Sequence, residues 1–410
     1  MRQRKLSVVL GLLSISCLLL ALSACGGGAN SNALSGGGGG APLPPAPPNA
    51  KAHSVYAVFP PVIPSDQNYS AFNTYVLANS NIAGVTVGLP WNIIESNTTP
   101  GSYDFSTFDA NVEHFLAAGK IVNLIVEPVA EGGTNSFTPS YVFGASWASS
   151  CCNTTPQDVV TCSSYAGNGT VDSGMPVVYE PPFETAYKNF IAAVIQHYNG
   201  NGTTPIGYIR FGLVMGGEAA PLCIDQWPLL GAPDFKTAFL TNYVTPMLAF
   251  EAAQKPAMQL LANIHVVGDP PDNSYADAEA QLAVQNSMGF GNNGLQQSDI
   301  NNYAAGQPCN ADWCSNFIKY VGTTLSNEDG ILLELQTLGK TDPTGATSTG
   351  SLTNLLPFAG DHYANTMELW PPDLLLAYDP NYLSTASASA AYAPYASAYA
   401  QAIAAYVASH

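Results

Sequence analysis

The sequence predicts an α/β fold, a single (β/α)8 TIM barrel with elaborated, disulfide-braced loops at the C-terminal face of its strands. Strand-like and helix-like segments alternate from residue 54 onward. Eight strand-like segments fit into about 350 residues, which is within the usual size of such a barrel. A doubly wound sheet is the alternative. Its first strand is usually followed by a glycine-rich phosphate loop, and Phe59-Pro60-Pro61-Val62 contains no glycine.

Each predicted strand is a short apolar run bounded by turn-forming residues. The eight runs are 54–59, 82–89, 120–128, 206–213, 258–266, 290–295, 330–336 and 366–370. Apolar residues at helical spacing predict helices at 70–77, 105–118, 187–198, 235–247, 276–288, 317–323 and 395–406, while 352–364 is a loop or a short helix. Ser106 is the expected cap of the second helix, and Gly119 is its expected C′ residue.

The first 25 residues have the pattern of a targeting segment. Arg2, Arg4 and Lys5 precede an apolar stretch over 8–22, which is too short for a membrane span. The stretch ends in Leu22-Ser23-Ala24-Cys25, which resembles the bacterial lipobox, whose cysteine is acylated and becomes the mature N-terminus. An ordinary signal peptide with an incidental Cys25 is the alternative.

The lipobox resemblance implies an exported bacterial lipoprotein that is held to a membrane by lipid on Cys25. Gly26, in place of an aspartate, resembles outer-membrane sorting in some bacteria, so we expect the outer membrane, facing the periplasm or the surface. Residues 26–50 are rich in Gly and Pro and are expected to be a flexible tether, because they cannot form a packed core. The barrel domain is expected to span 51–410.

The charge balance limits the partners of the exported chain. Without the targeting segment, which holds three of the 11 Lys+Arg residues, 8 remain against 29 Asp+Glu, a net charge of −21. Nucleic acid and anionic lipid would repel such a chain. A neutral polysaccharide is indifferent to this charge, so a carbohydrate is the expected partner.

Six cysteines follow the targeting segment, and an even number in an exported chain predicts disulfides. They are Cys151, Cys152, Cys162, Cys223, Cys309 and Cys314. Cys309 and Cys314 can close a small loop, and Cys223 can pair with one of the three that lie in the long predicted loop 131–182. No histidine pair stands at ligand spacing beside these cysteines, so no metal is expected, and no cofactor is expected either.

Two glutamates stand at the ends of apolar runs that are far apart in the sequence. The run 206–215 is followed by Gly216-Gly217-Glu218, and Glu334 lies inside 330–336. A carboxylate at a strand end is costly to bury without a reason. Two carboxylates that meet across the mouth of a barrel suit glycoside hydrolysis, in which one protonates the leaving oxygen and the other attacks or activates water.

Polar and aromatic side chains end the other predicted strands, where barrel enzymes bind their substrates. The candidates for substrate binding are Trp91, Asn92, Glu127, Asn263, His265, Asn292, Gln336, Glu368 and Trp370. Tryptophan rings can stack on the apolar faces of pyranose rings, but they can also simply pack in the core. His265 can instead be a core histidine, and Glu368 is the rival of Glu334 as nucleophile.

Four stretches carry a resemblance to a known enzyme group. They are Gly84-Val-Thr-Val-Gly-Leu-Pro-Trp-Asn92, Pro100-Gly-Ser-Tyr-Asp-Phe-Ser106, Ala117-Ala-Gly-Lys-Ile-Val-Asn-Leu124 and Met367-Glu-Leu-Trp370. Over roughly 55–410 the chain resembles the clan A glycoside hydrolases, which are retaining (β/α)8 enzymes with an acid/base glutamate after strand four and a nucleophilic glutamate after strand seven. The resemblance implies that Glu218 is the acid/base, that Glu334 is the nucleophile and that Trp370 floors the sugar site.

One position departs from that family. The family usually has an asparagine before the acid/base glutamate, where it binds the sugar 2-hydroxyl, and this chain has Gly217. Either Asn263 or Asn292 takes that role, or the site is altered or inactive. For each of the two glutamates, the alternative is a strand-end carboxylate that caps a helix or pairs with a cation.

Arg210 is the only arginine after the targeting segment. It shares strand parity with Tyr208 and Gly212, which is consistent with the interior face of the fourth strand. Glu127 is its expected partner, and a buried structural ion pair is favoured over direct contact with substrate.

We therefore expect a lipid-anchored glycoside hydrolase that cleaves an O-glycosidic bond in a poly- or oligosaccharide by a retaining two-glutamate mechanism. A non-catalytic carbohydrate-binding barrel is one alternative. A surface structural or adhesion lipoprotein that only uses the barrel as a scaffold is the other.

Overall fold

The computed structural model describes residues 52–59, 70–129, 137–144, 159–162, 172–200, 206–214, 217, 235–264, 273–305, 332–384 and 390–409. All of them belong to one compact unit, 38–410. The targeting segment, the tether and five of the six barrel cysteines lie outside the described residues, and of Cys162 only the backbone is described. The disulfides therefore stay a prediction.

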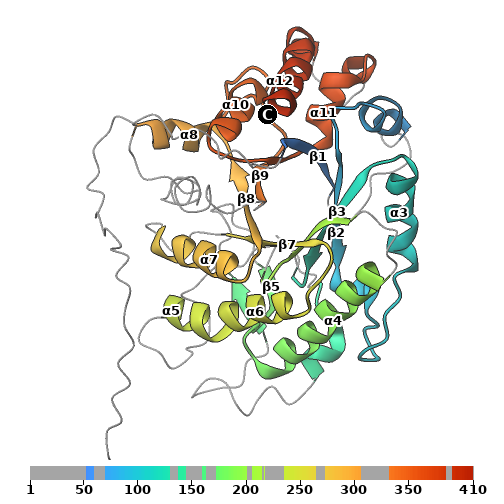
Figure 1. Cartoon of the computed structure of the whole chain (residues 1–410), viewed down its shortest axis with the longest axis vertical. Helices are drawn as coiled ribbons and strands as arrows, with labels where there is room; N and C mark the ends of the chain where they lie inside the picture. The colour runs from blue at the N-terminus through green and yellow to red at the C-terminus, as the bar shows by residue number, and fades with distance from the viewer. Residues whose placement is uncertain are drawn as a thin grey trace, which may run out of the picture. The chain divides into compact units, whose positions relative to one another are not determined.

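Eight parallel strands close into a barrel, which confirms the predicted fold class (Figure 1). The strands are β1 (Ser54–Phe59), β2 (Gly84–Pro90), β3 (Ile121–Glu127), β6 (Ile206–Phe211), β7 (Gln259–Asn263), β8 (Gly289–Leu295), β9 (Leu333–Thr337) and β10 (Thr366–Leu369). Each falls on one of the eight predicted runs. The barrel closes because β1 pairs with β2 on one side and with β10 on the other.

Helices follow the strands around the barrel (Figure 1). They are α2 (Trp91–Ile94), α3 (Ser106–Ala117), α4 (Pro181–Gly200), α5 (Phe235–Phe239), α6 (Thr245–Ala253), α7 (Asn273–Gln285), α8 (Gln297–Ala304), α10 (Leu352–Asp361), α11 (Pro371–Tyr378) and α12 (Ala396–Ala408). Short 3-10 or π segments are η1 (Phe72–Leu77), η2 (Ser140–Gly144), η4 (Leu240–Val244), η7 (Tyr382–Ser384) and η8 (Ala390–Tyr395).

Several local expectations are corrected. Ser106 does not cap α3 but begins it, and Asp104 Oδ1 accepts a hydrogen bond from the Ser106 amide. Gly119 does adopt the left-handed conformation expected after a helix, with φ of +73°. The sequence did not predict α8, which is mostly polar, or α11, which opens with two prolines. The predicted helix 317–323 lies outside the described residues.

The long predicted loop 131–182 contains regular structure. Its described part includes η2 and a two-stranded antiparallel ribbon formed by β4 (Val159–Cys162) and β5 (Asp172–Pro176). The remainder of the loop lies outside the described residues.

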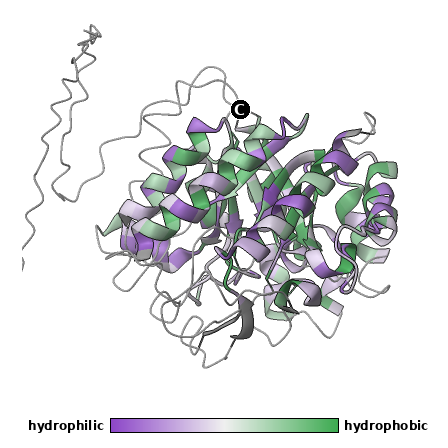
Figure 2. Cartoon of the chain, turned by 90° about the horizontal axis from the view of Figure 1, so that it is seen from below, coloured by the Kyte–Doolittle hydropathy of each residue, from purple (hydrophilic) through white to green (hydrophobic). Residues whose placement is uncertain are grey.

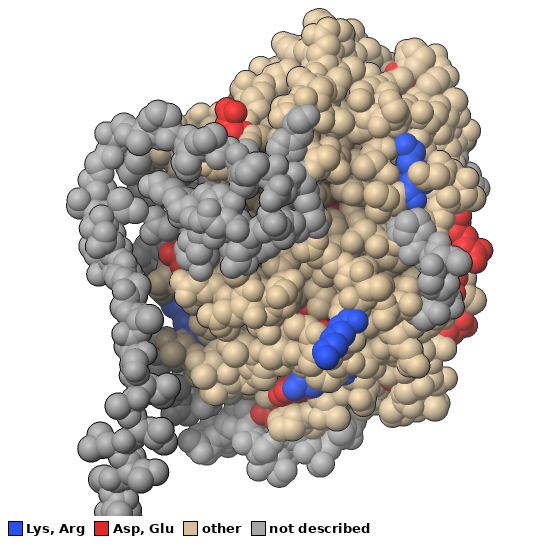
Figure 3. Space-filling model, viewed as in Figure 1, with Lys and Arg blue, Asp and Glu red and all other residues tan. Residues whose placement is uncertain are grey.

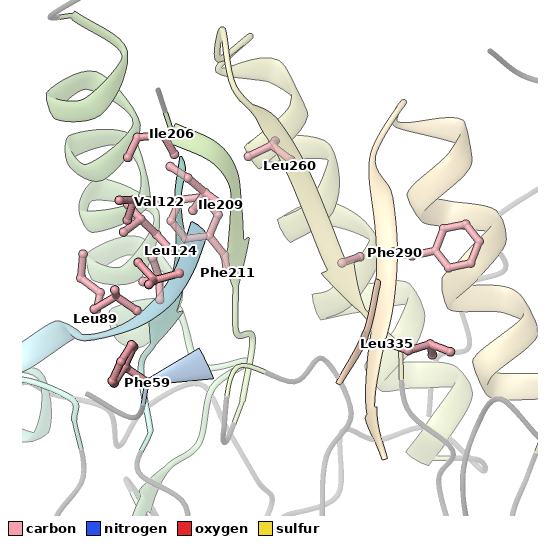
Figure 4. Close-up of a cluster of buried hydrophobic side chains, with 14 of the residues drawn as sticks. Phe59, Leu89, Val122, Leu124, Ile206, Ile209, Phe211, Leu260, Phe290 and Leu335 are labelled. Atoms are coloured by element: carbon pink, nitrogen blue, oxygen red, sulfur yellow. The ribbon is translucent and has the colours of Figure 1, made fainter. Parts of the chain in front are cut away.

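Side chains alternate along the strands between the helices and the barrel interior. On β6, Ile209 and Phe211 belong to the large core that includes residues of the helices, whereas Tyr208 packs with Leu261 and Leu332 in a separate cluster. Figure 4 shows the large core, in which strand residues such as Phe290 and Leu335 extend from the strands. In the hydropathy view the helices carry both green and purple faces (Figure 2).

Charged side chains are sparse on the surface. Only 10% of all residues are charged, and the face in Figure 3 is mostly free of them. No helix in the described part of the chain combines the length and the apolar character needed to cross a bilayer.

One buried carboxyl group lies outside the barrel interior. Glu251 on α6 is buried, and neither of its carboxyl oxygens has a hydrogen-bond partner among the described residues. The two tyrosines that feel its charge, Tyr187 and Tyr243, donate their hydroxyls to the Gly212 and Leu213 carbonyls instead. Burial therefore raises the pKa of Glu251 well above its usual value.

We predict that Glu251→Gln makes the free energy of unfolding less dependent on pH. A carboxyl whose folded-state pKa is raised stabilises the fold below its unfolded pKa of about 4.3, and this contribution is lost as pH rises. When the pH rises from 4.5 to 8, the difference in unfolding free energy between the variant and the wild type should shift in favour of the variant by at least about 1 kcal/mol. Urea unfolding at both pH values measures this, with the exposed Glu113→Gln on α3 as control. Parallel pH profiles of wild type and Glu251→Gln would contradict the assignment.

Candidate active site in the barrel interior

A single guanidinium lies inside the barrel between two carboxyl groups. Arg210, Glu334 and Glu368 are 1%, 0% and 0% exposed. Arg210 Nη1 lies 3.2 Å from Glu334 Oε2, and Arg210 Nη2 lies 3.8 Å from Glu368 Oε2. Glu127, the partner expected from the sequence, contributes to the electrostatics of Arg210 but less than these two glutamates. The prediction that Arg210 faces the interior is confirmed.

Two amide side chains hold the guanidinium in place. Arg210 Nη1 donates to Asn293 Oδ1 at 2.8 Å, and Nη2 donates to Gln336 Oε1 at 3.5 Å. Gln336 is two residues after Glu334, so both point to the same side of β9. The guanidinium is therefore fixed by residues of β8, β9 and β10, opposite its own strand β6.

Tyr208 links the carboxyls to a polar chain deeper in the barrel. Its hydroxyl donates to Glu368 Oε1 and also lies 3.4 Å from Thr86 Oγ1, to which Asn123 Nδ2 donates at 3.3 Å. Burial raises the pKa of Tyr208 well above 10, and the charge of Glu368 adds to this shift. Tyr208 therefore stays neutral and acts as a donor.

The two carboxyl groups interact directly. As ionised groups, Glu334 Oε1 and Glu368 Oε2 would both lack a hydrogen-bond donor. Both carboxyls contact the same guanidinium, so their charges repel each other when both are ionised. A proton on Glu334, whose pKa is raised, leaves one carboxylate opposite one guanidinium, so the charges balance.

Burial and the adjacent Glu368 raise the pKa of Glu334 well above its usual value, while Arg210 opposes this shift. Arg210 is therefore the contact that favours the ionised form of Glu334. A buried, perturbed carboxyl beside a specific charge partner is typical of functional sites, although structural ion-pair networks also produce it.

A missing side chain on β8 makes room for Glu334. Gly291 pairs with Glu334 in the sheet register, and a Cβ at 291 would lie 2.1 Å from Glu334 Oε2. Any other residue at this position would displace the carboxylate. Glycine in a strand interior often marks such a close approach.

Gly217 lies over the guanidinium. Its φ is +76°, and a Cβ there would lie 3.6 Å from Arg210 Nε but only 2.6 Å from Ile125 Cγ2. A Cβ at Gly212 would lie 2.5 Å from Gly217 Cα, so the chain folds back closely onto the end of β6. Asparagine tolerates this φ, but its Cβ would collide with Ile125. The structure thus gives a steric reason for glycine where the resembling family has asparagine.

Asn263 lies at the same level of the barrel. In the sheet register Asn263 pairs with Gly291, which in turn pairs with Glu334. Asn263 shares the interior face with Leu261, and it is buried. Neither of its amide atoms has a hydrogen-bond partner within the described part of the chain. It is the predicted substrate contact whose hydrogen-bonding groups are free.

The other predicted site residues are placed in several ways. Asn292 donates to the Ile264 carbonyl and accepts from the Gly294 amide, so its side chain is hydrogen-bonded to the backbone of two segments. Asn92 and Glu127 are partly buried after β2 and at the end of β3. Glu218 and His265 lie outside the described residues, so their roles stay predictions.

The two tryptophans that were predicted to stack on sugar rings lie in different surroundings. Trp91 is fully buried against Phe183, Tyr187 and Phe190, and its Nε1 donates to Glu95. This placement favours the packing alternative. Trp370 is partly exposed at the start of α11, with its Nε1 donating to the Thr337 carbonyl, and its sugar-binding role stays a prediction.

Glu334, Gln336 and Glu368 were all candidate site residues from the sequence, and the structure places all three around Arg210. Tyr208 and Asn293 also belong to this cluster, but the sequence did not assign them a role in it. Tyr208 has the same strand parity as Arg210, which was a usable signal. Asn293 stands beside Asn292 at the end of a predicted strand, but a register irregularity between Asn292 and Leu295 means that parity does not fix its direction.

Comparison with known proteins adds no identity: no protein family and no curated protein matches this chain. Within the described ranges, no group of three or more His, Cys, Asp or Glu side chains could hold a metal ion.

We predict that Arg210→Met destabilises the barrel more at high pH than at low pH. Without Arg210, burial and Glu368 still raise the pKa of Glu334 and no cation opposes them, so the stability contributed by protonated Glu334 is lost as pH rises above about 4.3. The variant should lose about 3–5 kcal/mol near neutral pH and clearly less at pH 4.5, as urea unfolding would show.

The matched control is Arg210→Met combined with Glu334→Gln and Glu368→Gln, which removes the titrating groups while it keeps their shape. This triple variant should show no extra pH dependence. A penalty for Arg210→Met that is the same at both pH values would rule out the proposed charge balance.

Proposed function

We propose that this protein is a glycoside hydrolase that cleaves an O-glycosidic bond in a poly- or oligosaccharide and retains the anomeric configuration. One observation carries the proposal: Glu334 lies in the barrel interior against Arg210, and Gly217, the residue before Glu218, lies over the same guanidinium. Fold alone would not support an activity, because barrels host many chemistries.

The carboxylate partner of Glu334 has to be a group other than Glu368. A retaining pair needs a separation of about 5–5.5 Å, so that the sugar fits between the two groups. Glu334 and Glu368 are both completely buried and both face the Arg210 guanidinium, which leaves no space between them for a sugar. Glu218, the residue that follows Gly217 in the sequence, is the proposed partner.

In the proposed mechanism, Glu218 donates its proton to the glycosidic oxygen while Glu334 attacks the anomeric carbon. The bond to the leaving sugar breaks and a covalent glycosyl ester forms on Glu334. Water then gives its proton to Glu218, attacks the same carbon and releases Glu334 as carboxylate. Arg210 favours ionised Glu334, and Asn263 is available to a sugar hydroxyl.

A second function is favoured by the complete burial of Glu334. A carboxylate that is fully occupied by an ion pair can be structural, in which case the barrel binds carbohydrate without cleaving it. This alternative keeps the polar cluster around Arg210 but predicts no covalent intermediate.

We predict that a 2-deoxy-2-fluoro glycosyl fluoride labels Glu334. The fluorine slows hydrolysis of the ester, so mass spectrometry of peptides should find the sugar on the peptide that holds Glu334. Glu334→Gln should abolish labelling and lower kcat for an aryl glycoside by at least about 1000-fold, and Glu218→Gln should lower kcat on poorly activated leaving groups by a similar factor.

Glu113→Gln is the matched control, because it removes an exposed carboxylate on α3, away from the barrel interior. A label on Glu368 would reassign the nucleophile. Hydrolysis of no sugar by folded wild type, with neutral sugars still bound, would establish the binding alternative.

We also propose that the chain is an exported lipoprotein anchored through Cys25, which the basic, apolar and cysteine pattern of the first 25 residues supports. In a bacterial host, radiolabelled palmitate should enter the wild-type chain and not Cys25→Ala, and wild type should sediment with membranes. Cys17→Ala, which alters the other cysteine of the segment, should label normally. Equal labelling of Cys25→Ala would contradict the anchor.

A further inference from the structure

A hollow lies on the outer side of the barrel, away from the Arg210 cluster. It has a volume of about 730 Å³, which is in the range of small-molecule sites. We call it the flank pocket and define it by six of its lining residues: Glu95, Tyr103, Tyr141, Thr185, Asn189 and Gln196. It lies between the loop that follows α2 and helix α4, and it shares no residue with the barrel-interior cluster.

Glu95 holds one wall of the flank pocket in shape. Its Oε2 accepts from Trp91 Nε1 at 2.5 Å, and its Oε1 accepts from the Gly101 amide at 2.7 Å and from the Tyr141 hydroxyl at 2.8 Å. The carboxylate is buried and its two oxygens are occupied by three donors. This wall is therefore preformed, and it presents the rings of Tyr103 and Tyr141 more than it presents a negative charge.

The opposite wall offers free hydrogen-bonding groups. Thr185, Asn189 and Gln196 are exposed on one face of α4, at spacings of four and seven residues that place them over about 16 Å. Their side chains make no hydrogen bond to any other described residue. Small alanines between them, Ala192 and Ala193, keep the wall open.

The chemistry of the two walls selects the ligand. No lysine or arginine lines the pocket, so an anion finds no partner there, and the net charge of the chain repels it further. The amides can donate and accept at the same time, which suits hydroxyl groups. Tyrosine rings offer flat apolar surface with a polar edge, which suits the C–H face of a pyranose.

We propose that the flank pocket binds a neutral oligosaccharide, with sugar rings against Tyr103 and Tyr141 and hydroxyls on Asn189 and Gln196. The choice of carbohydrate as ligand rests in part on the proposed function. The pocket lies near the end of the barrel where β2 and β3 finish, because α2 follows β2 directly and α4 starts after the loop from β3. A polysaccharide held there would stay at high local concentration near the barrel mouth.

Isothermal titration of the full chain tests this with neutral tetrasaccharides of glucose, galactose, mannose and xylose, and with anionic tetragalacturonate. Glu334→Gln is the background, so that no sugar is consumed. Adding Asn189→Ala and Gln196→Ala should weaken binding of at least one neutral tetrasaccharide about tenfold, because two hydrogen bonds are lost. Gln281→Ala, which removes an exposed amide on α7, is the matched control and should change nothing.

Binding that the paired substitution leaves unchanged overturns the inference. So does binding of no neutral tetrasaccharide, or tighter binding of tetragalacturonate. Hydrolysis of the same sugars by wild type is measured in parallel, so the two proposals fail separately. Binding that depends on Asn189 and Gln196 without any hydrolysis keeps the flank pocket and removes the hydrolase, and hydrolysis without such binding does the reverse.

Discussion

The barrel interior is organised around a charge that cannot be left unpaired. A guanidinium removed from water costs several kcal/mol unless anions and hydrogen-bond acceptors replace its hydration. Arg210 obtains these from Glu334, Glu368, Asn293 and Gln336, which come from three other strands. The same contacts specify register. Because strand side chains alternate, a slip of one residue would turn Arg210 or Glu334 out to the apolar core.

Placing this polar cluster inside the barrel requires space that side chains would otherwise fill. Gly291 leaves room for the Glu334 carboxylate, and Gly217 and Gly212 let the chain close over Arg210. The tyrosines Tyr187 and Tyr243 then fix the end of β6 through the Gly212 and Leu213 carbonyls. The absence of an asparagine before Glu218, which the family resemblance made conspicuous, follows from this packing. A Cβ at 217 has no room beside Ile125.

Much of the fold could be predicted because eight apolar runs separated by helical patterns leave few alternatives. Glu334, Gln336 and Arg210 could be assigned to the interior because strand parity decides it. Parity could not show that Glu368 would replace Glu127 as an ion-pair partner of Arg210, since that depends on how strands are staggered around the barrel. Trp91 illustrates the other limit. Its position after a strand suggested a sugar contact, but three aromatic residues of α4 surround it, and their distance in sequence hid this packing.

The polar cluster around Arg210 is not required for the stability of a barrel of this kind. Buried ion pairs can often be replaced by apolar residues of similar volume at no cost to stability, and many barrels fill their interior with branched aliphatic side chains. This chain instead keeps two carboxyls, one guanidinium and an unpaired amide at one level, with Tyr208 and Leu261 below. Such an arrangement sacrifices packing for groups that can hold charge and exchange a proton, which is the property that a catalytic or sugar-binding centre uses. The physical argument therefore favours a functional centre over a purely structural ion pair, and Gly217 lies over that centre.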